Sequence, residues 1–169
     1  AQADAEQAYT QSLLLGTKTW VFLPRERWPA EWIRLGLKNP VCPLQLALYG
    51  HPDSGGYWEK HCEKHLLSVG FTSVIDWRSC FWHERLCLFL VVYVDDLELA
   101  GPEGNLAEGW DLIRKGIDTD TSHAMNLFLG CLHEESVQTS PWIGKPVRVL
   151  TYNMQAYLED AVLKYRALA

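Results

Sequence analysis

Residues 86–101 read Leu-Cys-Leu-Phe-Leu-Val-Val-Tyr-Val-Asp-Asp-Leu-Glu-Leu-Ala-Gly, and this stretch decides how the chain folds. The residues before Asp95 are apolar and rich in β-branched and aromatic side chains, as in a buried strand. After Asp95 and Asp96, leucines alternate with acids, as in a strand that returns beside the first. The stretch therefore predicts a β-hairpin with two carboxylates at its tip. Taken alone, an Asp-Asp pair is also a common polar turn.

Length and composition indicate one compact unit over residues 1–169. Of the 169 residues, 48% are hydrophobic and 21% are charged, and eight are Trp, which favours a filled globular core over disorder. The formal net charge of -6 excludes a bulk basic protein. Any contact with nucleic acid must therefore depend on a local positive patch.

Cysteine usage and hydropathy indicate a reducing compartment. The five cysteines have no paired spacing and are odd in number, so we expect reduced, mostly buried thiols. The longest apolar run, around residues 86–94, is too short to span a bilayer, and no leader pattern opens the chain. We expect an intracellular protein that is not secreted and does not contact a membrane. Because the chain begins with Ala1, we also expect that upstream sequence is missing.

Hydrophobic periodicity and breaker residues divide the rest of the chain into further elements. Strands are expected at the segment ending in Asp4 and over residues 19–23, 71–81 with a turn, 125–132 and 144–150. Helices are expected over residues 6–15, 29–35, 56–69, 106–116 and 155–168. This order mixes hairpins with helices on one side of a sheet, which predicts an α+β fold.

Three details of these helices are predicted as well. The helix over residues 56–69 has an apolar face of Trp58, Cys62, Leu66 and Val69. Asn105 is placed to cap the helix over residues 106–116. In the last helix, the expected buried stripe consists of Leu158, Val162 and Tyr165.

Several fragments, taken in order, resemble a known family. They are Asp4-Ala5-Glu6-Gln7-Ala8-Tyr9, residues 41–50, Trp58, residues 67–71, Tyr93-Val94-Asp95-Asp96 with Ala100-Gly101, and Phe128-Leu129-Gly130. Their order and spacing resemble the reverse transcriptase of copia-type retrotransposons. The resemblance implies a polymerase palm, an antiparallel sheet backed by helices, with part of the fingers at about residues 17–56 and the start of a thumb at about 151–169. It also implies an RNA-directed DNA polymerase within a longer polyprotein, in a cytoplasmic particle or the nucleus.

The same resemblance assigns the catalytic and metal-binding residues to Asp4, Asp95 and Asp96, with Asp96 as the weaker member. Joining a nucleotide to a primer needs an activated 3′-hydroxyl and a neutralised pyrophosphate, and two Mg²⁺ ions about 4 Å apart supply both. Mg²⁺, or alternatively Mn²⁺, prefers hard oxygen ligands, and the backbone carbonyl of Ala5 would complete the nucleotide-side ion. Because clustered carboxylates repel one another, we expect metal binding to stabilise the fold.

Further roles for this family concern the dNTP, the template and the primer. Tyr9 would lie under the sugar of the incoming dNTP and exclude a 2′-hydroxyl, although a core tyrosine is the alternative. Tyr49 and Gly50 would lie beside the templating base pair of an RNA or DNA template. Phe128-Leu129-Gly130 would support the primer end.

The chain also departs from the family pattern. Residues 52–56, Pro-Asp-Ser-Gly-Gly, lack the two basic residues that family members carry after the Leu-Tyr-Gly segment. The basic fingers segment that grips the triphosphate should precede Asp4. A second hypothesis is therefore an inactive palm-fold remnant that acts as a binding or interaction module.

Three other groups of residues have the composition of a possible site. His61 and His65 have a spacing that can hold zinc or copper, but solvated histidines at the polar edge of a helix explain them better. Cys80 with the pair His83-Glu84 has the residue types of a thiol nucleophile, although no orienting partner is evident. The third, Trp20, Trp28 and Trp32, could form a stacking surface for single strands or could pack the base of the fingers.

Overall fold

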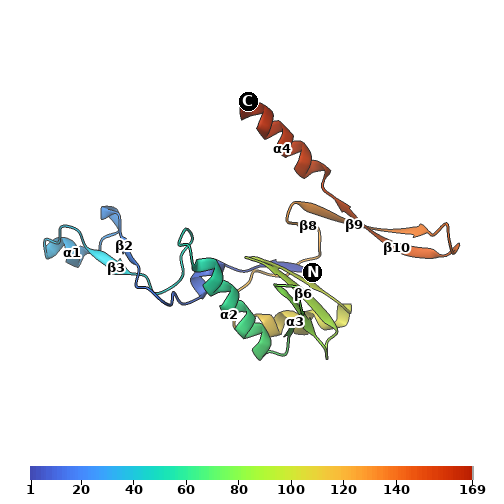
Figure 1. Cartoon of the computed structure of the whole chain (residues 1–169), viewed down its shortest axis with the longest axis horizontal. Helices are drawn as coiled ribbons and strands as arrows, with labels where there is room; N and C mark the ends of the chain where they lie inside the picture. The colour runs from blue at the N-terminus through green and yellow to red at the C-terminus, as the bar shows by residue number, and fades with distance from the viewer. Residues whose placement is uncertain (169) are drawn as a thin grey trace.

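The computed structural model describes residues 1–168 and is built around one five-stranded sheet (Figure 1). The strand order is β1-β7-β6-β5-β4, and every neighbouring pair is antiparallel. The strands are β1 (Gln2–Asp4), β4 (Thr72–Ser73), β5 (Cys80–His83), β6 (Leu88–Tyr93) and β7 (Asp96–Ala100). The predicted α+β class and antiparallel sheet are confirmed.

The predicted hairpin lies at the centre of this sheet. β6 pairs with β7 from Phe89 opposite Ala100 to Tyr93 opposite Asp96, so Val94 and Asp95 form a two-residue turn. Val94 adopts a φ of 56°, which is unfavourable for a β-branched residue. The two acids therefore have different positions, because Asp95 lies in the turn and Asp96 is the first residue of the returning strand.

Helices cover one face of the sheet, as predicted. Alternate residues of β6 and β7 are buried on that face, where they pack against α2 (Ser54–Ser68) and α3 (Glu103–Ile113). The residues of this core that come from the central strands and the two helices are Leu88, Leu90, Val92, Leu97, Leu99, Trp58, Cys62, Leu66, Trp110 and Ile113. The predicted apolar face of α2 is confirmed, with Val69 partly buried beside it.

The N-terminal end of α3 differs from the prediction. The helix begins at Glu103, and Pro102 takes the N-cap position, so Asn105 lies inside the first turn. The Asn105 amide instead donates a hydrogen bond of 2.8 Å to the Leu86 carbonyl. Asn105 thus joins α3 to the start of the hairpin rather than capping its own helix.

The helix predicted over residues 6–15 is shorter in the structure. It is a 3₁₀ helix, η1 (Ala8–Gln11), because Gln7 before it is left-handed at φ 50° and Ser12 after it is extended. The Ser12 hydroxyl donates to the Tyr9 carbonyl at 2.9 Å and ends the helix. This short helix keeps Tyr9 close to β1.

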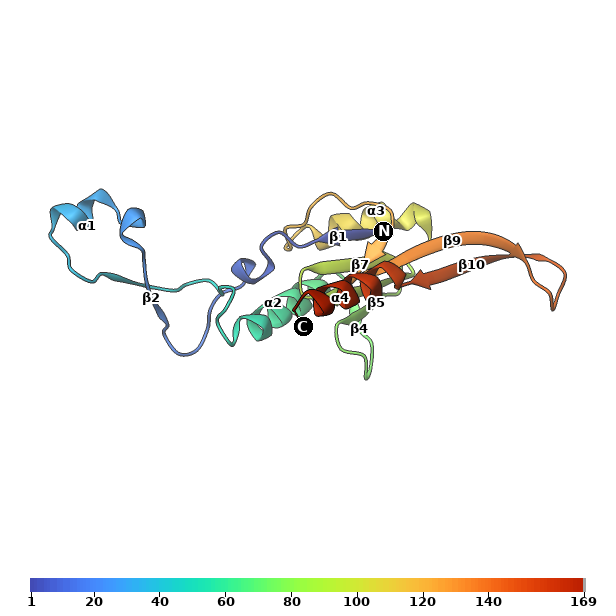
Figure 2. The ribbon, with the colours of Figure 1, turned by 90° about the horizontal axis from the view of Figure 1, so that it is seen from above.

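Residues 17–44 form an arm that projects from one end of the sheet domain (Figures 1 and 2). Its elements are β2 (Trp20–Phe22), η2 (Arg25–Arg27), α1 (Ala30–Arg34) and β3 (Val41–Pro43). β2 and β3 pair antiparallel as a separate two-stranded sheet. None of these residues belongs to the hydrophobic core cluster of the main sheet.

The C-terminal part projects as a second extension (Figure 2). Its elements are β8 (Leu127–Phe128), β9 (Cys131–Thr139), β10 (Pro146–Asn153) and α4 (Gln155–Leu168), with strand order β10-β9-β8. The single strand predicted over residues 125–132 is wrong, because Leu129 and Gly130 both have positive φ and turn the chain back on itself. The predicted helix over residues 155–168 is confirmed.

The predicted burial along α4 is wrong. Leu158, Val162 and Tyr165 are 59%, 49% and 74% exposed. α4 extends away from the main sheet (Figure 1), so their side chains have no core to enter. Periodicity identified the apolar face of the helix but not whether another element covers it.

The five cysteines differ in burial. Cys62 and Cys80 are buried, Cys42 and Cys131 are half-buried, Cys87 is exposed, and all five are free thiols. The expectation that most are buried is therefore wrong.

In residues 1–168, no helix combines the length and apolar character needed to cross a membrane.

Candidate active site

The three predicted catalytic acids come together at one end of the central sheet. β1 pairs with β7 so that Asp4 lies directly opposite Asp96. The Ala5 amide donates a 2.7 Å hydrogen bond to the Asp95 carbonyl, which joins the end of β1 to the hairpin turn. Residues opposite each other in a sheet share a face, and Leu97 next to Asp96 is buried under the helices. Asp4 and Asp96 therefore point to the face that the helices leave open.

The carboxylates influence one another electrostatically. The pKa of Asp96 is raised, first by partial burial and then by the negative charges of Asp4 and Asp95. A bound cation would reverse this effect because it favours the ionised form. Within residues 1–168, however, no three His, Cys, Asp or Glu side chains are grouped closely enough to hold a metal ion. The donor chemistry of the three acids fits Mg²⁺, although their carboxylates do not form a ready three-ligand group.

Asp120, which was not among the predicted site residues, orders the end of β1. The Asp4 amide donates to the Asp120 carboxylate at 2.9 Å, and the Asp120 amide donates to the Asp4 carbonyl at 2.9 Å. Arg114 donates in turn to the Asp120 carbonyl at 3.0 Å. Nothing in the local pattern identifies Asp120, because its partner is 116 residues away in the chain.

Replacing Asp96 by Asn should stabilise the protein when divalent cations are absent. Since the folded-state pKa of Asp96 is raised, ionised Asp96 destabilises the fold at neutral pH, and this penalty disappears as the pH falls below the ordinary Asp value of about 3.9. We expect Asp96→Asn to raise Tm in EDTA at pH 7 by about 1–3 °C, with the gain shrinking near pH 3.

Differential scanning fluorimetry with and without Mg²⁺ measures both effects. Mg²⁺ should raise the Tm of the parent more than that of Asp96→Asn, because the ion relieves the same repulsion. Glu98→Gln is the matched control, since Glu98 lies two residues further along β7 and faces the same side of the sheet. An equal gain in Tm for Glu98→Gln would argue against a specific repulsion at Asp96.

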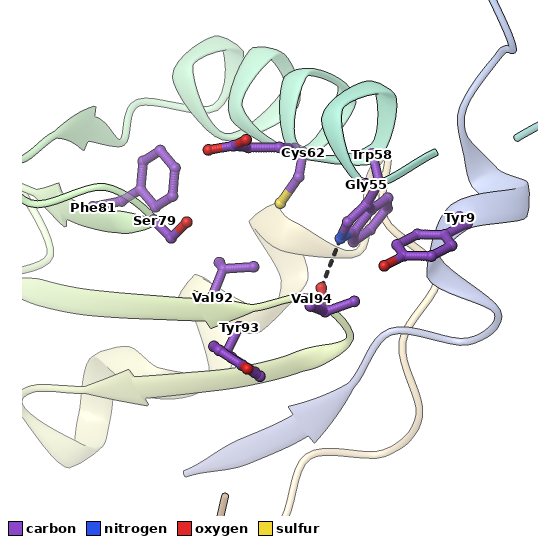
Figure 3. A pocket seen from close by; sticks show the side chains of 10 residues that line it. Tyr9, Gly55, Trp58, Cys62, Ser79, Phe81, Val92, Tyr93 and Val94 are labelled. Atoms are coloured by element: carbon purple, nitrogen blue, oxygen red, sulfur yellow. Dashed lines mark hydrogen bonds between the residues drawn. The ribbon is translucent and has the colours of Figure 1, made fainter. Parts of the chain in front are cut away.

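Trp58 on α2 holds the tip of the hairpin from the face of the sheet that the helices cover (Figure 3). The Trp58 indole Nε1 donates a 2.6 Å hydrogen bond to the Val94 carbonyl, and the side chain is only 2% exposed. The indole therefore links α2 to the turn that carries Asp95. This contact restrains a turn residue whose backbone conformation is unfavourable.

A cavity of about 310 Å³ opens beside this contact. Figure 3 shows it between α2 and β6, with Tyr9 at one end and Phe81 at the other. The Cys62 thiol lines its wall, and burial raises the pKa of Cys62 to about 12. The cavity wall also includes Glu59 and Ser79 among mainly apolar side chains, and none of the three predicted catalytic acids lines it.

Removing the Trp58 donor should loosen the hairpin tip. Trp58→Phe leaves the Val94 carbonyl without its protein partner, and we expect an unfolding free energy lower by about 1–2 kcal/mol. Hydrogen exchange at the amides of the turn should become faster, and mass spectrometry of peptides covering residues 88–100 measures it.

Trp110→Phe is the matched control for this substitution. Trp110 is equally buried, and its Nε1 has no hydrogen-bond partner among residues 1–168. Both substitutions remove the same atoms from the core, but only Trp58→Phe removes a hydrogen bond. The assignment is contradicted if Trp110→Phe accelerates exchange at the turn as much as Trp58→Phe does.

The structure brings together two of the residues predicted to contact the nucleotide. The rings of Tyr9 and Tyr49 stack with centroids 4.4 Å apart and an interplanar angle of 29°. Gly50 adopts φ 91°, and a side chain added there would meet open space. The buried Ser54 hydroxyl accepts from the Leu48 amide and donates to its carbonyl, which holds the loop that carries Tyr49.

The predicted primer-supporting residues form a turn linked to β1. Phe128 pairs with Cys131 across the β8–β9 turn, and Leu129 and Gly130 occupy the turn itself. The Gln2 side-chain amide donates to the Leu127 carbonyl at 3.0 Å, which ties β8 to the strand that carries Asp4. A side chain at Gly130 would collide with the ring of Tyr157 on α4, at 2.7 Å.

The structure also shows the surroundings of the histidines and cysteine that were considered as alternative sites. His61 stacks against Trp58 with ring centroids 6.0 Å apart, and His65 Nε2 lies 3.1 Å from the Leu112 carbonyl, so both histidines pack rather than being solvated. His83 is buried against Phe71, and its Nδ1 accepts from the Leu86 amide at 3.3 Å. Because Cys80 and His83 are three residues apart on β5, they point to opposite faces and cannot act as a pair.

The chain was also compared with known proteins. No family model, no curated protein and no solved structure matches it.

Proposed function

We propose that this chain is the palm region of a copia-like RNA-directed DNA polymerase, which extends a primer with dNTPs. The observation that carries the proposal is the pairing of Asp4 with Asp96 on adjacent strands, with Asp95 in the turn between β6 and β7. Acids from two strands on an open face form a site that a primer end can reach. The ordered fragments that resemble this family support the same function.

Asp4, Asp95 and Asp96 are the residues that would hold Mg²⁺ in this proposal. Bound there, the metal would activate the primer hydroxyl and neutralise the leaving pyrophosphate. The chain itself orients these carboxylates through the strand pairing, the bond from Ala5 to Asp95 and the bond from Trp58 to Val94. Partial burial and the charges of Asp4 and Asp95 raise the pKa of Asp96, and a cation bound there would offset both effects.

Two tyrosines provide the nucleotide side of the proposed site. Tyr9 follows β1 by five residues, and its ring is fixed by stacking on Tyr49. A ring held in this way can act as a rigid floor for a sugar, because it loses little freedom when the nucleotide binds. We therefore assign discrimination against a 2′-hydroxyl to Tyr9.

Primer extension on an RNA template, with Mg²⁺ or Mn²⁺, tests the proposal. The assay compares the parent protein with Asp95→Asn, and incorporation of dNTPs by the parent alone is the expected result. Equal extension by both proteins would contradict the catalytic assignment.

A non-enzymatic palm-fold module is the second candidate. It is favoured by the carboxylates of residues 1–168, which do not group into a three-ligand metal site, and by the absence of basic residues at positions 52–56. Failure of the parent to extend a primer, together with no change of Tm in Mg²⁺, would favour this candidate.

A further inference from the structure

The C-terminal helix α4 carries an apolar stripe that stays exposed. The stripe consists of Leu158, Val162 and Tyr165, which are 59%, 49% and 74% exposed. Their spacing of four and three residues places them on one side of the helix. No residue of α4 is buried. A continuous apolar stripe of this kind is typical of a helix that packs against another helix.

Two charged side chains lie along one flank of the stripe. Glu159 directly follows Leu158, and Arg166 directly follows Tyr165, so the two charges are seven residues apart on the same side of the helix. Both border a groove that Leu158 and Val162 also line. Among residues 1–168, neither Glu159 nor Arg166 forms an ion pair. The flank therefore offers one negative and one positive charge to a partner.

This charge pattern is complementary to itself in a twofold antiparallel pair of α4 helices. In such a pair, each flank of one helix meets the same flank of the other in the reverse direction. When the pair is centred beside Val162, Glu159 of each copy is level with Arg166 of the other. Asp160, which pairs with Lys164 within the helix, is likewise level with Lys164 of the other copy. In a parallel pair, acids would be level with acids and bases with bases, and these would repel.

The same arrangement brings the apolar side chains level with one another. A centre within half a residue of Val162 places Leu158 of each copy level with Tyr165 of the other. Val162 is then level with Val162 of the second copy. Burial of these exposed side chains would drive the association, and the charge pairs would select the antiparallel orientation.

The extension that carries α4 is also a part of the chain where two copies do not repel each other. Residues 127–168 contain four acidic and four basic residues, whereas the whole chain has a net charge of -6. Figure 1 shows α4 projecting away from the main sheet, so a second helix can approach the stripe.

We propose that α4 docks antiparallel against α4 of a second copy of this chain, with the stripe at the interface and Glu159 paired with Arg166 across it. Two short helices bury less area than an interface of standard size, so we expect a weak dimer with a Kd on the order of 0.1 mM. At concentrations well below this Kd, as in thermal unfolding, the chain is monomeric. The carboxylate site takes no part in the contact, so the dimer does not depend on primer extension.

Sedimentation velocity of the full chain, from tenfold below to tenfold above the expected Kd, measures the association. The sedimentation coefficient of the parent should rise with concentration toward that of a dimer. Leu158→Glu should stay monomeric, because the pair would bury an unpaired carboxylate. Val137→Glu is the matched control and should associate like the parent, since Val137 is 73% exposed on β9 and lies outside the stripe. A parent that stays monomeric, or equal losses of association in the two variants, would overturn the proposal.

Exchanging the charges tests the antiparallel orientation. Arg166→Glu and Glu159→Arg each replace two attractive contacts of the dimer by two repulsive ones, so each should raise Kd at least about tenfold. An equimolar mixture of these two variants should associate like the parent, because each acid is then level with a base. Glu135→Arg makes the same charge change on β9 and should leave Kd unchanged. Circular dichroism verifies that each variant keeps its helix content. An unchanged Kd in Arg166→Glu and Glu159→Arg, or a mixture no tighter than its components, would overturn the proposal.

Discussion

Asp95→Asn is expected to lower the rate of primer extension by at least about a hundredfold, and Asp4→Asn by a similar factor. Each substitution removes one negative charge from the site where strands β1 and β7 meet. The amide is close in size to the carboxylate, so the hydrogen bonds made by the backbone of Asp4 and Asp95 should persist. Asp96→Asn should have a smaller effect, about tenfold, because it is the weaker member of the proposed set.

The relative sizes of the three losses in extension rate test the roles assigned to the three acids. Single-turnover extension at saturating dNTP measures the chemical step, and Tm verifies that each variant is folded. Asp111→Asn is the control, since Asp111 is an exposed acid on α3, which covers the opposite face of the sheet. A similar loss of activity in Asp111→Asn would indicate a general effect of charge. A larger loss in Asp96→Asn than in Asp95→Asn would contradict the assigned roles.

Leu90→Ala should cause a large loss of stability. Leu90 is fully buried at the centre of β6, opposite Leu99 and Phe81 on the neighbouring strands. Removing a buried leucine side chain costs about 2–5 kcal/mol from lost burial and from the cavity that remains. For a chain of this size, the expected fall in Tm is about 5–15 °C.

Leu158→Ala on α4 is the control for this measurement. The same atoms are removed, but Leu158 is 59% exposed, so we expect Tm to change by less than about 2 °C. Thermal unfolding followed by circular dichroism compares the two variants directly. If Leu158→Ala cost as much as Leu90→Ala, the apolar stripe of α4 would be covered in solution.

Local patterns were sufficient for the elements whose partners are close in sequence. The apolar run and the following alternation in residues 86–101 predict a buried strand, a returning strand and the turn between them, and the structure confirms all three. The spacing of Trp58, Cys62 and Leu66 predicts the buried face of α2 for the same reason. Period and alternation report directly on which side of an element is apolar.

Predictions of where an element ends and which group a side chain contacts were less successful, because both depend on contacts between distant residues. Asn105 looked like a helix cap, but the Leu86 carbonyl offered it a better acceptor. Residues 125–132 looked like one strand, but positive φ at Leu129 and Gly130 divides them into a hairpin. Both differences arise because backbone groups find partners that no local window contains.

The sequence by itself determined the central hairpin and the place of Asp95 and Asp96 at its tip, since side-chain alternation follows from the geometry of a strand. Only the tertiary structure decided that Asp4 pairs with Asp96, that Asp120 orders Asp4 and that Trp58 holds Val94. These contacts join segments that no local pattern connects. The stripe of α4 shows the same distinction, because an apolar face is a local property and its burial is not.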